Sequence, residues 1–155
     1  SVSQAQSYAN HSMYMASIIL TAWDSAMKAS AVAAPALDAA FAPAVRLHLL
    51  DAYGWQLLAC NRVTGLPLNP PHCVAAMPLL ADGIEVAPEV KEFRLLEAGG
   101  WLAELQKEIA PGLAPIAPAH VLAVERTRFN YATATDCFRE LERLMDRVSG
   151  DIDES

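Results

Sequence analysis

Most prolines of this chain gather in two stretches, residues 66–88 and 111–118, and this placement constrains the fold more than any other feature. Proline disrupts a helix interior but suits connections and first helical turns. Outside these stretches, apolar residues recur every three or four positions, which is the period of one helix face. The pattern predicts helices over residues 4–30, 36–63, 88–109 and 135–149, with a short helix at 72–81.

We therefore expect an all-α fold, a single-domain antiparallel bundle of four to five helices with proline-rich connections. Residues 1–150 form the helical domain in this prediction, and residues 151–155 form a flexible acidic tail. We find no internal repeat and no domain boundary in the pattern. A chain of 155 residues can bury a core without disulfides or metals.

The second predicted helix contains Pro43, which either kinks the helix or is its true start. Beyond Pro43, residues 44–60 are apolar on most sides. A helix that is apolar nearly all round is typically the central one of a bundle. Gly65 and Pro67 are expected to end it.

The later helices carry their own boundary signals. Gly99-Gly100 either permits close approach of another helix or marks a kink. Thr135 is expected to cap the last helix and Gly150 to end it. The segment 119–124 is expected to be extended.

Hydrophobic residues make up 54% of the chain and charged residues 19%, so it is more apolar than an average globular domain. The surplus predicts an unusually full core, a subunit interface or a pocket for an apolar ligand, and composition does not choose among them. The net charge is −7 and the basic residues are scattered. Both observations argue against a nucleic acid as the partner.

The chain has three cysteines, an odd number without a CxxC motif, which suits buried thiols in a reducing compartment. No basic segment precedes a short apolar run, so we expect no signal peptide. The longest apolar stretch, residues 13–23, is too short and too polar to span a bilayer. We therefore expect a cytoplasmic protein without a membrane partner.

Metal-binding and phosphate-binding motifs are absent from the sequence. The adjacent pair His72-Cys73 is its most ligand-like feature, but no second pair follows at zinc-finger spacing. The motifs HExxH, GxGxxG and the P-loop are missing too. We therefore expect no metal site and no cofactor, with His72 as an exposed loop histidine beside a half-buried thiol.

Four residues on two predicted helices are candidates for lining a ligand pocket: His48, Asp51, Trp55 and Tyr14. His48 and Asp51 are three residues apart and share a helix face. The pair could orient a catalytic imidazole, but no nucleophile is identifiable, so a structural role is favoured. The aromatic residues line either such a pocket or, by default, the core or a dimer contact.

Three segments together carry a resemblance: residues 7–11 (SYANH), 97–105 (EAGGWLAEL) and 136–147 (DCFRELERLMDR). With the long helix between the first two, they resemble a gammaproteobacterial, Pseudomonas-like family of small helical proteins, a domain-of-unknown-function family. The resemblance covers most of the chain and rests on packing patterns. It implies a bacterial, cytoplasmic, all-α protein and carries over no catalytic or binding residue.

Three functions follow from these observations. The favoured one is a non-enzymatic helical protein that acts through protein–protein contacts, as a homodimer or by binding a partner. The alternative is a small apolar-ligand-binding module with a pocket between helices, in which His48 and Asp51 are polar contacts. The least favoured is a hydrolase-type enzyme that uses His48, Asp51 and Cys60.

Overall fold

The computed structural model describes residues 2–113 and 129–154 of the chain, with side chains up to residue 150. These ranges contain five α-helices, one 3-10 turn and no strand. The helices are α1 (Gln4–Ala29), α2 (Ala34–Cys60), α3 (Glu89–Gly99), α4 (Trp101–Gln106) and α5 (Tyr131–Glu154), and the 3-10 turn η1 is Val74–Ala76. The predicted all-α bundle is confirmed.

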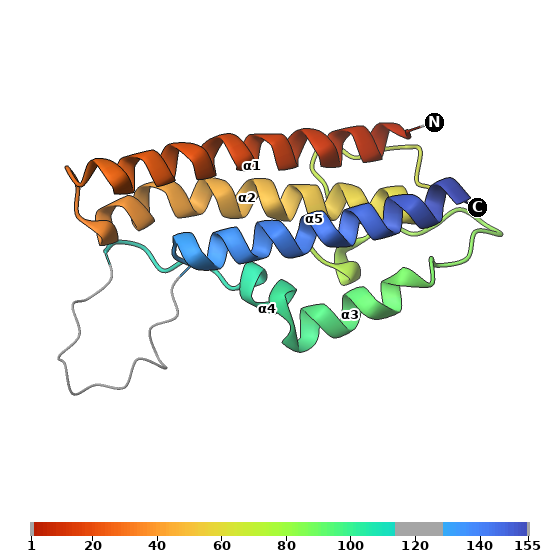
Figure 1. Cartoon of the computed structure of the whole chain (residues 1–155). Coiled ribbons are helices and arrows are strands. Elements are labelled where there is room, and N and C mark those ends of the chain that lie inside the picture. The colour runs from red at the N-terminus through yellow and green to blue at the C-terminus, as the bar shows by residue number, and fades with distance from the viewer. Residues whose placement is uncertain (1, 114–128, 155) are drawn as a thin grey trace.

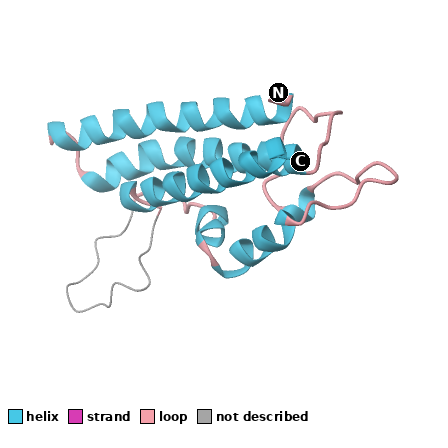
Figure 2. Ribbon diagram, turned by 45° about the vertical axis from the view of Figure 1, so that its right-hand side comes forward, coloured by secondary structure: helices cyan, strands magenta, loops and turns pink. Residues whose placement is uncertain are grey.

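The three long helices lie side by side, and the short pair α3 and α4 packs across them (Figure 1). The α1 helix runs antiparallel to α2, and a short turn after Ala29 joins the two helices. The connection from α2 to α3 lies at the end of the bundle that holds both termini (Figure 2). The α2 helix contacts α1, α5 and α4, so it has neighbours on most sides.

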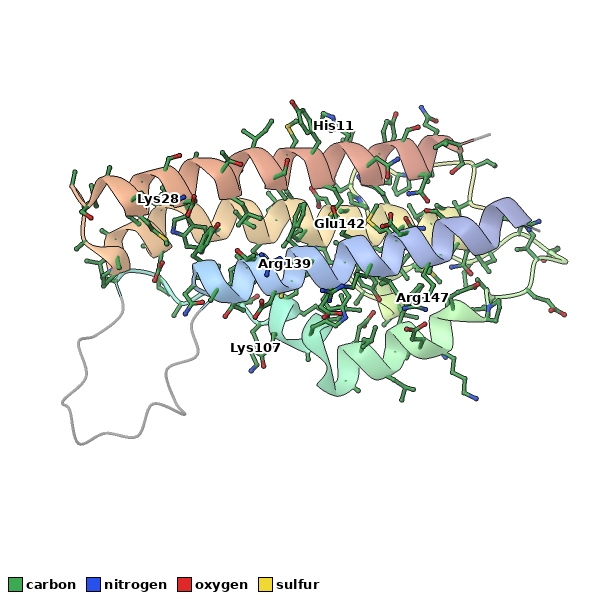
Figure 3. The ribbon with its side chains drawn as sticks, viewed as in Figure 1. His11, Lys28, Lys107, Arg139, Glu142 and Arg147 are labelled. Carbon is green, nitrogen blue, oxygen red and sulfur yellow. The ribbon has the colours of Figure 1, made fainter. Side chains whose placement is uncertain are left out.

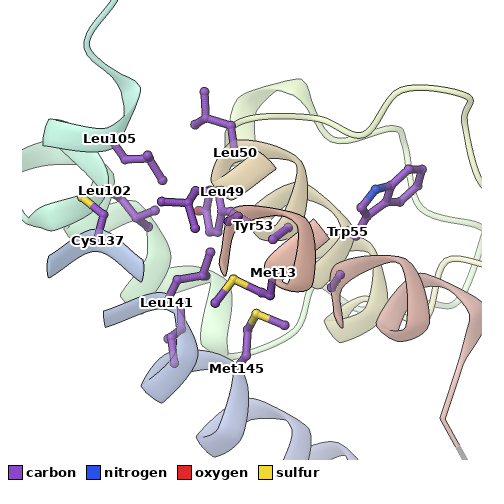
Figure 4. Packing of buried hydrophobic residues seen from close by; sticks show 14 of the residues in the cluster. Met13, Leu49, Leu50, Tyr53, Trp55, Leu102, Leu105, Cys137, Leu141 and Met145 are labelled. Atoms are coloured by element: carbon purple, nitrogen blue, oxygen red, sulfur yellow. The ribbon is translucent and has the colours of Figure 1, made fainter. Parts of the chain in front are cut away.

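The core forms around the second half of α2, where Tyr53, Leu57 and Leu58 are fully buried. Side chains from α1, α4 and α5 converge on this half, including Met13, Leu102 and Leu141 (Figure 4). Each fully buried leucine contributes about 1.5–3 kcal/mol relative to an exposed one. The prediction that this helix is central is confirmed, and the reason is its lack of a polar side.

The α2 helix is continuous through Pro43, so the alternative that Pro43 starts it is wrong. The helix begins at Ala34 instead, with Pro35 in its first turn, where the missing N–H of proline costs nothing. The helix ends at Cys60, three residues before the predicted end. Two residues later, Arg62 adopts a left-handed conformation with φ of 55°, and a right-handed helix cannot continue through such a residue.

Two predicted helices are shorter than expected or divided. The segment 72–81 contains only the turn η1. Pro78 follows this turn closely, and the Val74 N–H bonds to Glu97 of another helix instead of within a longer helix here. The segment 88–109 divides into α3 and α4 at Gly100, whose backbone is extended. A Cβ atom at Gly100 would lie 2.9 Å from Leu96 Cδ2, so the glycine allows this sharp break.

The last helix, α5, is longer than predicted at both ends. It begins at Tyr131 because the Asn130 side chain accepts a hydrogen bond from the Thr133 N–H at 2.9 Å. Thr135 therefore lies inside the helix and does not cap it. The helix also continues past Gly150 to Glu154, so Gly150 does not end it. The expected extended segment 119–124 lies outside the described residues.

One exposed ion pair joins α5 to α3 and gives a pH-dependent prediction. Two Arg147 nitrogens donate to the two Glu92 carboxylate oxygens, each at 2.8 Å, and these bonds lower the pKa of Glu92 below its ordinary 4.5. A lowered folded-state pKa means that the stabilisation is present above the unfolded pKa and is lost as the pH falls. We expect Glu92→Gln to cost about 0.5 kcal/mol near neutral pH, because exposed pairs contribute little.

Urea denaturation followed by circular dichroism measures this cost, and it should shrink as the pH falls below 4.5 and disappear below the lowered folded-state pKa of Glu92, where both variants lack the charge. A cost that stays constant between neutral and acidic pH would contradict the assignment to the ion pair.

Candidate functional site

The outer face of α1 carries no charged residue before Lys28 in its last turn, which is unusual for a helix on a protein surface. No Asp, Glu, Lys or Arg precedes Asp24 in the chain. The residues of this face recur at three- and four-residue spacing and are all exposed: Ser7, His11, Tyr14, Ile18, Thr21 and Ser25. Exposed helix faces in soluble proteins are usually polar and charged.

Two large side chains of the outer face reach into solvent. Tyr14 is 62% exposed and Ile18 is 47% exposed, and they lie one helical turn apart. His11 projects from the same helix away from the bundle (Figure 3). Tyrosine is among the residues enriched at protein interfaces, because its ring offers apolar area and its hydroxyl a hydrogen bond.

Most charges of the described chain lie on other elements, and the two charged residues of α1, Asp24 and Lys28, form an ion pair near its C-terminal end. The α5 helix displays Arg139 and Glu142, and the ion pairs of Arg143 with Glu140 and of Arg147 with Glu92 lie on or beside it (Figure 3). The α3 helix has acidic residues in its first turn. Another surface can therefore approach the part of α1 before Asp24 without removing a charge from water, which makes such contact less costly there.

The structure separates the four residues predicted to line a pocket. Tyr14 lies on the outer face of α1, and His48 is half-buried on α2. Trp55 is buried and packs edge-on against Tyr8, with ring centroids 5.1 Å apart. Together they line an open groove of about 630 Å³ next to residues 66–68. Of the four, Trp55 alone is among the residues that line this groove.

Asp51 pairs with a residue that sequence spacing did not suggest. Its Oδ1 lies 2.7 Å from His72 Nε2, and both side chains are partly exposed. The connection after α2 reaches Asp51 because it crosses the helix at Gly54, where no side chain stands in its way. His72 comes 21 residues later in the chain, so no local rule relates it to Asp51.

Further hydrogen bonds hold this crossing segment to two other helices. Gln106 on α4 donates to the His72 carbonyl at 2.9 Å. Glu97 on α3 accepts from the Val74 N–H at 2.9 Å and from the Tyr53 hydroxyl with the same oxygen. Burial, and then the bond to Glu97, raise the pKa of Tyr53 well above its ordinary value, so the phenol stays protonated. The arrangement fixes the connection, and sequence analysis missed both Tyr53 and Glu97.

The residues considered for catalysis do not come together. His48 and Cys60 lie on the same helix twelve positions apart, a separation of about 18 Å along its axis. Burial raises the pKa of the Cys137 thiol to about 12, which leaves it protonated and unreactive at neutral pH. In the part of the chain that the structure describes, no three His, Cys, Asp or Glu residues are placed to hold a metal ion.

None of the described helices is both long and apolar enough to cross a membrane. Comparisons of the chain with protein-family models, with curated proteins and with solved structures gave no match. The resemblance to the Pseudomonas-like family therefore stays a prediction.

Proposed function

We propose that this protein works through protein–protein contacts and pairs with a second copy of itself through the outer face of α1. The observation that carries the proposal is the exposure of Tyr14 and Ile18 on a helix face that has no charged residue before Lys28. Exposed apolar side chains that lie singly need no explanation, but a helix face free of charge over most of its length is a feature of interfaces.

The charge distribution supports a second copy as the partner. In a two-fold symmetric dimer the same patch of both subunits meets, so a charged residue near the axis lies opposite the identical residue of the partner and is repelled by it. With a net charge of −7, two copies repel each other at most orientations. The repulsion is smallest where neither surface carries a charge, and the outer face of α1 meets that condition from Ser7 to Ser25.

The size of the patch predicts a weak or moderate dimer. The α1 helix has 26 residues, so it is about 39 Å long and, at about 10 Å width, projects roughly 400 Å². A stable interface buries roughly 800 Å² on each partner. The contact must therefore extend beyond α1 itself. We expect dissociation in the micromolar range.

The double variant Tyr14→Glu/Ile18→Glu tests the proposal. Four acidic groups would then meet across the two-fold axis, and we expect the dimer to become a monomer at tens of micromolar protein. Size-exclusion chromatography with light scattering measures the mass. Both residues are exposed, so circular dichroism should show an unchanged fold.

Leu95→Glu provides the matched control, because Leu95 is 70% exposed on α3 and lies on another helix. The control should remain dimeric. A monomeric parent protein, or equal dissociation of the control and the double variant, would contradict the proposal.

We also infer a cytoplasmic location from the cysteines. Cys60, Cys73 and Cys137 are all free thiols, and two of them are buried in the core. Proteins of oxidising compartments more commonly pair their cysteines in disulfides. Fractionation of cells that express the chain with an epitope tag tests this inference, and recovery outside the cytosolic fraction would contradict it.

A further inference from the structure

A cavity of about 390 Å³ lies between the first half of α2 and the chain that follows α4. Its walls are mostly apolar and come from prolines, alanines, Ile109 and Phe129. Three charged side chains also line it: Asp38, Arg46 and Glu108. Pockets for small molecules typically have this combination of apolar walls and a few polar groups, and volumes of about 300–1,000 Å³.

Asp38 has no partner for its charge in the described part of the chain. It makes neither a hydrogen bond nor an ion pair there, although its side chain is half-buried. Burial raises the pKa of Asp38 above its ordinary 3.8, which shows that its carboxylate is short of compensating interactions. Carboxylates in partly buried sites normally gain such a partner.

Arg46 does not fill this need, because its guanidinium is bound to the wall of the cavity. Its Nε donates to the Leu105 carbonyl at 3.1 Å and its Nη2 to the Gln106 carbonyl at 3.0 Å. These carbonyls belong to the end of α4, where helical acceptors lack partners. Glu108 is exposed at the rim and adds a second acidic group. Among the described residues, the lining of the cavity therefore has two acidic groups and one basic group, a net charge of −1.

We propose that this cavity binds a small organic cation, a primary amine on an apolar body. The ammonium group would pair with Asp38, and the apolar body would lie against Ile109, Phe129 and the proline and alanine side chains. Hydrogen bonds between ionised partners are about twice as strong as neutral ones, which makes the amine the part that selects the ligand. This site is separate from the outer face of α1, and the proposal does not depend on dimerisation.

Titration with three probes of similar size tests the charge requirement: 2-phenylethylamine, 2-phenylethanol and 3-phenylpropionate. Isothermal calorimetry gives the affinities, and amide chemical shifts in ¹⁵N-labelled protein locate the site. We expect the amine to bind at least ten-fold more tightly than the alcohol, and the acid not to bind. The shifted signals should include those of Ala39, Ala42 and Ile109.

Two variants then test the residue. Asp38→Asn should weaken amine binding ten-fold or more, while Glu142→Gln, which removes the same charge from the exposed surface of α5, should leave it unchanged. Ala39→Phe, which fills the cavity, should abolish binding of the amine. The proposal is overturned if the amine does not bind at millimolar concentration, if the alcohol binds equally well, or if Asp38→Asn binds the amine like the parent.

Discussion

Replacing Gly54 with alanine is expected to destabilise the protein by roughly 3 kcal/mol, although alanine is the better helix former by about 1 kcal/mol. A Cβ atom at this position of α2 would lie 1.8 Å from the Pro71 carbonyl oxygen and 2.9 Å from Pro70 Cβ. The nearest of these atoms belongs to the backbone, and rotation of a side chain cannot relieve the clash. The crossing segment would have to move away from α2, which would also separate His72 from Asp51.

Gly99→Ala is the matched control, because no atom lies within 4 Å of a Cβ atom at Gly99, the last residue of α3. It should be neutral or stabilising by up to about 1 kcal/mol. Urea denaturation followed by circular dichroism gives both free energies of unfolding. Equal stabilities of the two variants would show that the connection does not press on α2 at Gly54.

Replacing Glu97 with alanine is expected to cost about 3 kcal/mol, since it leaves two donors without an acceptor. These donors are the hydroxyl of the fully buried Tyr53 and the Val74 N–H, both of which bond to the same Glu97 oxygen. Removing one partner of a buried hydrogen bond leaves the full desolvation penalty of the other. The effect should exceed that of any substitution among the exposed ion pairs, which contribute at most about 1 kcal/mol each.

Glu97→Gln separates the hydrogen bonds from the general effect of changing this residue. The glutamine carbonyl oxygen can accept both bonds, so we expect a cost of about 1 kcal/mol, which reflects the lost ionic character. Denaturation at neutral pH measures both variants. If the glutamine variant is as unstable as the alanine variant, the negative charge and not the acceptor geometry holds the crossing segment.

Sequence periodicity predicted the long helices because apolar spacing depends only on one buried face. It predicted the ends of these helices less well, because a single capping side chain decides where a helix begins or ends. Asn130 starts α5 five residues before Thr135, and both residues are of a type that caps helices. The break at Gly100 was one of two alternatives, and only the contacts of α4 with α2 and α5 select it.

The candidate site was less predictable than the fold. The α1 helix has no charged residue before Asp24, so its pattern does not say whether Tyr14 faces the core or solvent. The pairing of Asp51 with His72 depends on where a proline-rich connection crosses α2, and the sequence signal for that crossing is a single helical glycine, Gly54. An unpartnered carboxylate such as Asp38 is visible only once its surroundings are known.

The most direct test of the account is an isotope-filtered NMR experiment on a mixture of labelled and unlabelled protein. Such an experiment records only contacts between different copies of the chain. The account predicts intermolecular contacts of the Tyr14 ring and the Ile18 methyl groups, both on the outer face of α1. Contacts that map to another face, or no intermolecular contacts at a protein concentration of hundreds of micromolar, would contradict it.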